Sequence, residues 1–99
     1  MQDATRHYIN GQWVASIDGR KVEVENPSTE RKIATITLGG VADADAAVAA
    51  AKAAFPAWAA TGPLDRIAAL ERLMEVYKSR TKDMAQAISS EMGAPIALA

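Results

Sequence analysis

Hydrophobic and polar side chains alternate through the first forty residues, with the period of a β-strand that buries one face. In residues 21–25, valines alternate with charged side chains. Another run, 8–14, contains Asn10-Gly11, a dipeptide that accepts positive φ in a tight hairpin turn. A third run, 32–38, is closed by two glycines. The pattern predicts three short strands in a small antiparallel β unit.

Two segments between these runs also carry turn residues. Asp18-Gly19 offers a second turn with the same chemistry as Asn10-Gly11. Pro27 cannot donate a hydrogen bond to a neighbouring strand, so we expect the second strand to end at the Asn-Pro dipeptide.

From residue 41 the hydrophobic period becomes that of an α-helix. Asp43 and Asp45 lie near its expected N-terminal end, where the helix dipole favours negative charge. Pro56 is expected to break or kink this first helix. The apolar stripe of the helix consists of Ala44, Val48, Ala51 and Phe55.

Two further helices are expected after the first. One should start at Gly62-Pro63, because proline suits the first helical position. The last should begin at Thr81 and stop at Gly93. The residues expected to face inward are Ile67, Leu70, Met74 and Tyr77, then Met84 and Ile88. The chain is therefore predicted to be an α+β unit, a small antiparallel β unit followed by three helices.

The amino-acid composition limits the size of the hydrophobic core that these elements can form. The hydrophobic fraction is 49%, but 22 of the 99 residues are alanine, which favours helix and contributes little apolar area. There is no cysteine, so disulfides, thiolate nucleophiles and cysteine metal sites are excluded. The core is predicted to be thin, with bulky side chains that pack against something outside this chain.

Charge and hydropathy narrow the classes of partner. The formal net charge is −1, with 11 basic and 12 acidic residues interspersed, so no basic surface for nucleic acid or an anionic membrane is expected. No run approaches the ~20 apolar residues of a membrane span, and the first ten residues lack the apolar stretch of a signal peptide. We expect a soluble, cytoplasmic protein.

The one histidine, His7, lies in a polar arm before the first predicted strand. A catalytic role would require a partner within hydrogen-bond reach, and no residue nearby in the sequence has the required character. An exposed, solvated side chain is therefore predicted.

Paired acids and paired glycines also have ordinary structural explanations. Carboxylates on the outer face of a strand, near a helix N-terminus or on a solvated helix face lack the apolar surroundings that raise a carboxyl pKa for acid catalysis. Gly39-Gly40 is explained by a strand-to-helix turn, since no phosphate-loop motif surrounds it. We therefore predict no catalytic and no cofactor-binding residue. The acid pairs are Glu23 with Glu25, Asp43 with Asp45, and Glu71 with Glu75.

Five segments in this order and spacing resemble the N-terminal region of the NAD(P)-dependent aldehyde dehydrogenase family. The resemblance runs over nearly the whole chain. The segments are Tyr8-Ile9-Asn10-Gly11-Gln12-Trp13, Val24-Glu25-Asn26-Pro27-Ser28-Thr29-Glu30, Ile33-Ala34-Thr35-Ile36, Ala53-Ala54-Phe55-Pro56-Ala57-Trp58 and Glu91-Met92-Gly93-Ala94-Pro95.

The resemblance implies a parent α/β enzyme, several times longer, with a Rossmann-type coenzyme domain. Residues 1–99 would form the N-terminal part of that domain, with strands in 1–40 and helices in 41–95 that pack against the rest. The parent would oxidise aldehydes to carboxylic acids with NAD or NADP, as a homo-oligomer. Its catalytic cysteine, glutamate and asparagine and its coenzyme-binding residues would lie further along the chain.

The resemblance also implies one structural site. Some members of the family hold a monovalent cation through backbone carbonyls just before the Asn-Pro and just before the later Gly-x-Pro. These carbonyls correspond here to Val24, Glu25 and Glu91.

Three interpretations of the chain remain open at this point. The first is an inactive fragment of an aldehyde dehydrogenase, which the apolar run 95–99 favours because domains usually finish in polar segments. The second is a small interaction module that exposes Trp13, Trp58 and that apolar run as a binding surface. The third is the ordered or proteolysed front of a longer protein. The aldehyde and the choice between NAD and NADP would depend on residues outside this sequence.

Overall fold

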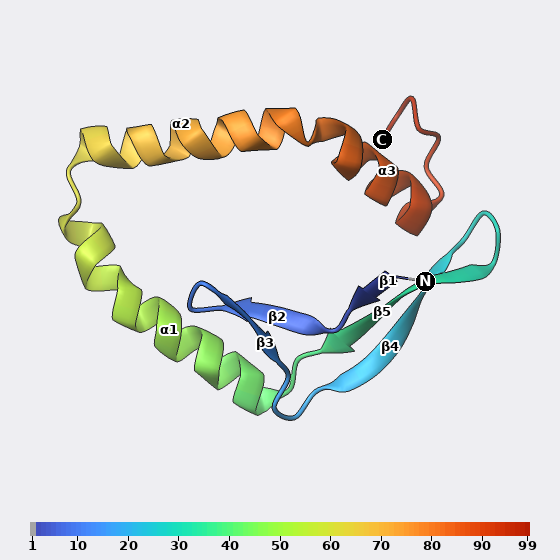
Figure 1. Ribbon diagram of the computed structural model, residues 1–99, viewed down its shortest axis with the longest axis horizontal. Helices are drawn as coiled ribbons and strands as arrows, with labels where there is room; N and C mark the ends of the chain where they lie inside the picture. Colours follow the sequence, from blue (N-terminus) through green and yellow to red (C-terminus); the bar gives the residue numbers. More distant parts are fainter. Residues whose placement is uncertain (1) are drawn as a thin grey trace.

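The computed structural model describes residues 2–99, and within them strands precede helices, as predicted (Figure 1). The α+β order of the elements is confirmed. The elements are β1 (Gln2–Ala4), β2 (Arg6–Ile9), β3 (Gln12–Ala15), β4 (Arg20–Asn26), β5 (Arg31–Leu38), α1 (Val41–Ala60), α2 (Pro63–Ser79) and α3 (Thr81–Met92).

The predicted hairpin is formed by β2 and β3, which pair antiparallel. Its two turn residues both have positive φ, 54° at Asn10 and 75° at Gly11, which is the geometry that matches the twist of the flanking strands. Tyr8 lies opposite Trp13, and their ring centroids are 5.1 Å apart. This cross-strand aromatic pair stabilises the hairpin.

The single antiparallel β unit predicted from the sequence is wrong, because the strands divide between two sheets. β2 and β3 form one sheet, and the other has the order β1-β5-β4. β4 and β5 are antiparallel, with Val22 and Val24 half-buried and the alternate residues exposed. β1 pairs parallel with β5. Side-chain alternation could not reveal β1, since its pairing uses the backbone of three exposed residues.

The Asp18-Gly19 segment is not a hairpin turn, contrary to the prediction. It links β3 to β4, which belong to different sheets, and Gly19 does not have positive φ. Glycine is required there for space, because a Cβ atom would collide with the carbonyl oxygen of Leu38 and the hydroxyl of Ser16. The segment is a tight crossing between the two sheets.

The helix boundaries agree with the sequence, with one correction. Pro63 occupies the first turn of α2, and α3 ends at Gly93 with φ 76°. Of the break or kink predicted at Pro56, the break is wrong, since α1 continues through this residue to Ala60. The missing amide of Pro56 removes one hydrogen bond, and the helix tolerates that loss near its C-terminal end.

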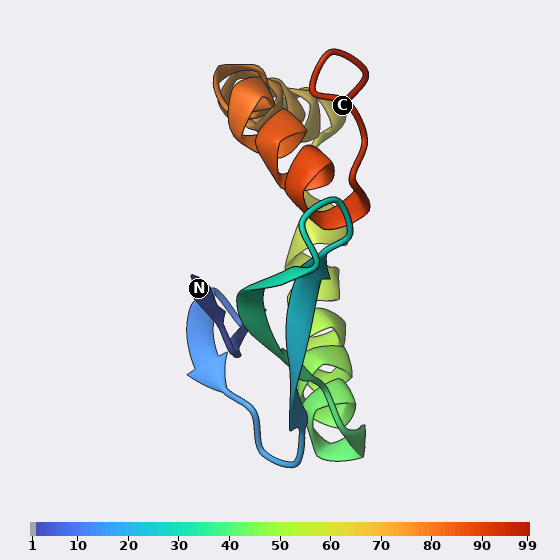
Figure 2. The ribbon, with the colours of Figure 1, turned by 90° about the vertical axis from the view of Figure 1, so that its right-hand side faces the viewer.

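The inward packing predicted for the helix stripes is not found in this chain. Within residues 2–99 no hydrophobic side chain is buried, and Phe55, Leu70 and Met84 are 66%, 59% and 51% exposed. The radius of gyration is 17.2 Å, against about 13 Å for a compact domain of this size. α1 leads away from the sheets, α2 runs back on the far side of the molecule, and α3 approaches the β4–β5 turn (Figures 1 and 2). The helices present apolar faces that nothing in the described chain covers.

Candidate functional site

Asp43 is the one side chain buried within residues 2–99, with an exposed fraction of 5%. It lies in the first turn of α1, next to the strand-to-helix turn at Gly39-Gly40. A buried carboxylate requires hydrogen-bond donors or an opposite charge to offset its lost hydration. The residues around it therefore define the most constrained polar site in the described chain.

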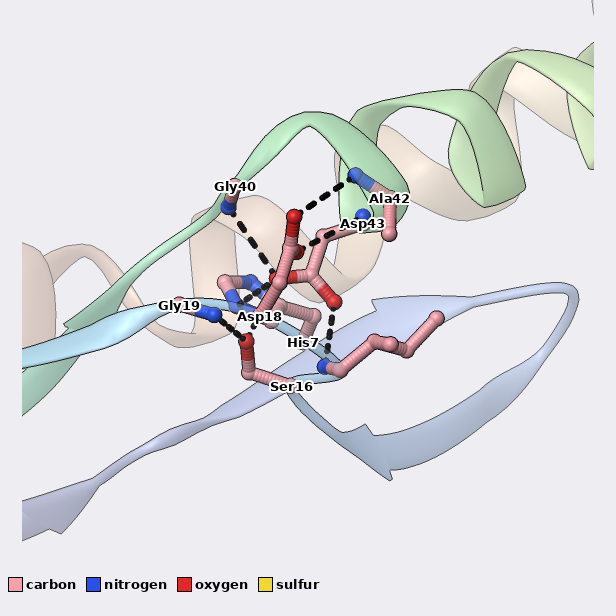
Figure 3. A network of polar contacts seen from close by, with 8 residues as sticks. His7, Ser16, Asp18, Gly19, Gly40, Ala42 and Asp43 are labelled. Atoms are coloured by element: carbon pink, nitrogen blue, oxygen red, sulfur yellow. Dashed lines mark hydrogen bonds and ion pairs between the residues drawn. The ribbon is translucent and has the colours of Figure 1, made fainter.

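Three donors from two separate segments converge on the Asp43 carboxylate (Figure 3). The Ile17 amide donates to Oδ1 at 2.7 Å, and the Ser16 hydroxyl donates to Oδ2 at 2.5 Å. The Gly40 amide donates to Oδ2 at 3.1 Å. The bond from Ile17 and then that from Ser16 lower the pKa of Asp43 to about 2, although burial opposes the shift. The group is therefore a carboxylate at every physiological pH.

Asp18 caps the N-terminus of α1, although it lies in a different segment of the sequence. Its Oδ2 accepts a hydrogen bond from the Ala42 amide at 2.9 Å, and its Oδ1 accepts one from the Asp43 amide at 3.3 Å. These amides are the donors that an N-cap side chain would normally satisfy. The N-cap residue is Gly40, and a Cβ atom there would collide with the Asp18 carboxyl group. The glycine is thus needed to admit a cap from another segment.

His7 is not the exposed, solvated side chain predicted from the sequence. It belongs to β2, and its Nε2 is buried and has no hydrogen-bond partner within residues 2–99. This nitrogen lies 4.0 Å from Oδ2 of Asp43. The prediction failed because the neighbour comes from α1, far along the sequence, and not from the residues around His7.

The chemistry available to this cluster is structural. Ser16 donates to Asp43 and not to His7, so the three side chains do not have the order that activates a serine nucleophile. A carboxyl group with a pKa of about 2 is a weak general base and cannot serve as an acid near neutral pH. Asp43 therefore fastens the start of α1 to the crossing between the two sheets.

The remaining candidate acids are exposed, as expected. Glu23 forms an ion pair with Lys32 across the β4–β5 ladder. Within residues 2–99 no three histidine or acidic side chains gather closely enough to hold a metal ion. In the same range no helix combines the length and apolar character that a membrane span requires.

The model of the aldehyde dehydrogenase family matches residues 13–99. The chain belongs to the aldehyde dehydrogenase family. It superposes on a crystal structure of an aldehyde dehydrogenase from Bartonella henselae with a TM-score of 0.96 and 44% identity, over 99% of this chain and 21% of that one. The fold described above is thus one that crystal structures of this family contain.

Two further relatives agree. The aldehyde dehydrogenase C of Pseudomonas syringae, solved with NAD+ and octanal, superposes with a TM-score of 0.91 and 44% identity, over 94% of this chain and 19% of that one. A Staphylococcus aureus protein assigned as an aldehyde dehydrogenase is 42% identical over 98 residues, which are 99% of this chain and 21% of the relative. The chain spans about a fifth of the length of the relatives it matches.

In this aldehyde dehydrogenase segment, the residues proposed to supply cation-binding carbonyls come from two elements that touch. Val24 and Glu25 are in β4, and Glu91 is near the end of α3, which packs on β4. At Gly93 an added Cβ would lie 3.0 Å from the Ser28 hydroxyl, so the end of α3 closely approaches the β4–β5 turn. The cation site stays a prediction, because the contacts between α3 and β4 are not contacts of the carbonyl oxygens of Val24, Glu25 and Glu91.

Sequence reasoning missed the roles of Ser16 and Asp18. It also missed the contacts that Asp43 makes with residues far from it in the sequence. One signal was present: Gly40 begins a helix but has no oxygen with which to cap it. The first amides of such a helix have no side-chain acceptor from the N-cap itself, and Asp18 is the acidic residue of the segment that precedes β4. Nothing in the hydrophobic pattern says which helix that acid reaches.

Proposed function

We propose that residues 1–99 are the N-terminal segment of an enzyme that oxidises aldehydes to carboxylic acids with NAD or NADP, and that the segment is inactive by itself. The observation that carries this proposal is coverage: relatives match 99% of this chain, yet the chain accounts for 21% of their length. The enzyme's chemistry would come from the remaining part.

The role of the segment is to form the N-terminal part of the coenzyme-binding domain, with strands in 1–40 and helices in 41–95. Its uncovered apolar faces support this role, since Leu64, Leu73 and Phe55 are 81%, 63% and 66% exposed. Surfaces of this kind mark an interface or an interior that another part of the protein covers. A Rossmann-type fold in the remainder of the chain would be their partner.

The coenzyme would be held by residues outside this segment. Helix N-termini bind phosphates through free amides, but the amides that begin α1 are already bonded to two carboxylates, Asp18 and Asp43. These negative charges disfavour a pyrophosphate at that position. NAD(P) would supply the hydride acceptor of the reaction, and the start of α1 does not fit its pyrophosphate. The Pseudomonas syringae structure described above was solved with NAD+.

The proposal includes three further properties of the whole enzyme. A monovalent cation would bind the carbonyls of Val24, Glu25 and Glu91 between β4 and α3. The enzyme would be a homo-oligomer, and it would reside in the cytoplasm. Elemental analysis of the purified enzyme would test the first property, and light scattering and cell fractionation the other two.

The decisive experiment measures the native polypeptide that carries this sequence. An antibody raised against residues 1–40 would be used on lysate of the source cells. We expect a band about five times 10.5 kDa, because the chain spans 21% of its relatives, and co-purification with NAD(P)-dependent aldehyde oxidation. A single band at 10.5 kDa would overturn the proposal and favour the small interaction module.

The enzyme segment and the small interaction module also differ in whether residues 1–99 should fold independently. An interaction module should unfold cooperatively as a 99-residue protein, and Trp13 and Trp58, which are 66% and 48% exposed, would belong to its binding surface. An enzyme segment should show no cooperative transition when it is isolated, because no hydrophobic side chain of residues 2–99 is buried. Calorimetry of residues 1–99 separates the two.

A further inference from the structure

The tip of the β2–β3 hairpin is an exposed, left-handed turn that the proposed function does not use. Asn10 has φ 54°, a conformation that asparagine adopts more readily than most residues, and its side chain is exposed. Gly11 follows with φ 75°, and apart from its chain neighbours no atom of residues 2–99 lies within 4 Å of the position that a Cβ atom would take. The turn therefore places an exposed side-chain amide directly before an unhindered main-chain nitrogen.

The nitrogen of Gly11 is also free of hydrogen bonds. The ladder of the hairpin ends with the pair of Ile9 and Gln12, and within residues 2–99 the Gly11 amide donates to no acceptor. The tip points toward α1 in Figure 1, and a hollow of about 340 Å³ separates the two turn residues from small side chains of that helix, such as Ala47. Water therefore reaches the turn from this side.

We propose that Asn10 is a modification site, at which the Gly11 nitrogen attacks the side-chain amide and converts asparagine to aspartate or isoaspartate. The nitrogen loses its proton to a base in solution and bonds to Cγ of Asn10, while the bond from Cγ to Nδ2 breaks and ammonia leaves. The product is a five-membered succinimide ring. Water then opens one of the two C–N bonds of the ring, which gives aspartate or isoaspartate, and no other reactant is required.

The dipeptide Asp18-Gly19 offers the same pair of groups, but the fold holds both of them. The Gly19 amide donates to the Ser16 hydroxyl at 2.7 Å. The two carboxylate oxygens of Asp18 accept hydrogen bonds from the first amides of α1, at 2.9 and 3.3 Å. Ring closure would break these bonds, and a carboxylate is a poorer electrophile than an amide because of its negative charge. The structure therefore directs ring formation to Asn10.

The other asparagine of the sequence is an internal control. Asn26 precedes Pro27, whose nitrogen carries no hydrogen and cannot close the same ring. Its Oδ1 accepts a hydrogen bond from the Ser28 amide at 2.9 Å. Direct hydrolysis of the side-chain amide by water would affect Asn26 as well as Asn10. A difference between the two asparagines thus measures ring closure.

The two products change the hairpin unequally. Aspartate keeps the length of the main chain and adds a negative charge at the tip. Isoaspartate lengthens the main chain by one carbon inside a two-residue turn, whose backbone twist matches that of the flanking strands. The pairing of Tyr8 with Trp13, next to the turn, is therefore weakened in the isoaspartate form.

The test incubates the native polypeptide that carries residues 1–99, at whatever length it occurs, at pH 8 in buffer and in urea. Peptide mass spectrometry, with fragmentation that distinguishes isoaspartate from aspartate, follows Asn10, Asp18 and Asn26. We expect Asn10 to be converted in buffer at a rate within about tenfold of that in urea, because a two-stranded hairpin opens readily at its tip. Isoaspartate at Asp18 should form at least about tenfold faster in urea than in buffer, since its hydrogen bonds are lost there. Asn26 should stay unconverted in both.

A variant and a structural readout complete the test. Asn10→Gln should lose the conversion, because the longer side chain would have to close a six-membered ring, which forms less readily. Hydrogen exchange on the separated isoaspartate form should show reduced protection in residues 6–15 and unchanged protection in residues 20–38, which cover β4 and β5.

The proposal is overturned if Asn10 is converted only in urea, if Asn26 is converted as fast as Asn10, or if Asp18 forms isoaspartate equally fast in buffer and in urea. Conversion that persists in Asn10→Gln, or an isoaspartate form with full protection of residues 6–15, would also contradict it. These readouts do not involve aldehyde oxidation, so failure of the modification is distinguishable from failure of the proposed function.

Discussion

A carboxylate that accepts three hydrogen bonds in a position nearly out of water has little freedom to move, since each bond fixes one direction. Asp43 is in this position, and its donors come from the crossing before β4 and from the turn before α1. Polar contacts therefore set the angle at which the first helix leaves the sheets. In most domains a buried apolar cluster does this, and here no hydrophobic side chain of residues 2–99 is buried.

Replacing Asp43 by asparagine tests this role through its pH dependence. The folded pKa of about 2 lies below the ordinary value near 3.9, so the carboxylate stabilises the fold above about pH 4 and that contribution is lost as the pH falls toward 2. We expect Asp43→Asn to lower the melting temperature of the native polypeptide at pH 7. The difference from the unsubstituted protein should shrink toward pH 2.5.

The matched control for this comparison is Asp45→Asn, which removes an exposed acid from the same helical turn. Its melting temperature should stay near that of the unsubstituted protein at pH 7. Equal differences for Asp43→Asn at pH 7 and pH 2.5 would show that the carboxylate's charge is not what its donors stabilise.

The two glycines that begin α1 and α2 predict different outcomes for the same substitution. A Cβ at Gly40 would collide with the Asp18 carboxyl group, whereas at Gly62 it would meet only Oδ2 of Asp65, at 4.0 Å. Gly62→Ala should lose only the preference of an N-cap for glycine over alanine, whereas Gly40→Ala should also remove the cap and cost about 1 kcal/mol more. Urea unfolding of the native polypeptide measures both.

A double substitution refines this test. Asp18→Ala should cost the part of the Gly40→Ala loss that comes from the cap, and the two together should cost little more than Gly40→Ala alone, because both remove one interaction. Additive losses would mean that Gly40 is required for a reason other than admission of the Asp18 side chain.

At the scale of elements, the sequence revealed those structures whose signal is local. β4 and β5 alternate, Asn10-Gly11 has the φ values that a tight hairpin demands, and α3 ends at Gly93 as its glycine indicated. Alternation does not say which strands pair, so the division into two sheets was missed. Asp18-Gly19 has the same chemistry in a hairpin and in a crossing, and only the partner strands distinguish them.

Gly11 and Gly93 both have a left-handed backbone conformation, but only Gly93 is crowded. The same substitution at both positions therefore distinguishes the cost of backbone strain from the cost of crowding. Gly11 and Gly93 have nearly equal φ, 75° and 76°, but an added Cβ meets nothing within 4 Å at Gly11. At Gly93 it would lie 3.0 Å from the Ser28 hydroxyl and 3.1 Å from Pro27. Gly11→Ala should cost about 1 kcal/mol, the strain of the left-handed conformation alone. Gly93→Ala should cost more.

Melting temperatures of the native polypeptide rank these two variants, and hydrogen exchange locates the damage. Gly93→Ala should expose amides of both α3 and the β4–β5 turn, since the added methyl group would push these elements apart. Equal effects of the two substitutions would indicate that α3 and the turn can separate without loss.

At the scale of the whole molecule, amphipathic stripes indicate which helix face is apolar but not what covers it. The sequence predicted that the apolar stripe of α2 faces inward, yet Ile67, Met74 and Tyr77 are all about half exposed or more. The covering surface is absent from residues 2–99, and no pattern within them could have described it. The contacts of Asp43 escaped detection for a related reason: they join positions more than twenty residues apart, and periodicity carries no information at that separation.

A chimera tests whether the stripe is an interior surface. Residues 1–99 would replace the matched segment of the Bartonella henselae enzyme, with which they share 44% identity and the same fold. We expect a soluble protein that retains aldehyde oxidation. Leu70→Glu places a charge in the apolar stripe. If the rest of the enzyme covers the stripe, this carboxylate is buried without a partner, so most of the soluble protein should be lost. Glu71→Gln alters the neighbouring position on the charged face and should leave yield and activity near those of the unsubstituted chimera. If Leu70→Glu were equally well tolerated, the α2 stripe would face solvent in the enzyme, and the exposed helices of this chain would require a different partner.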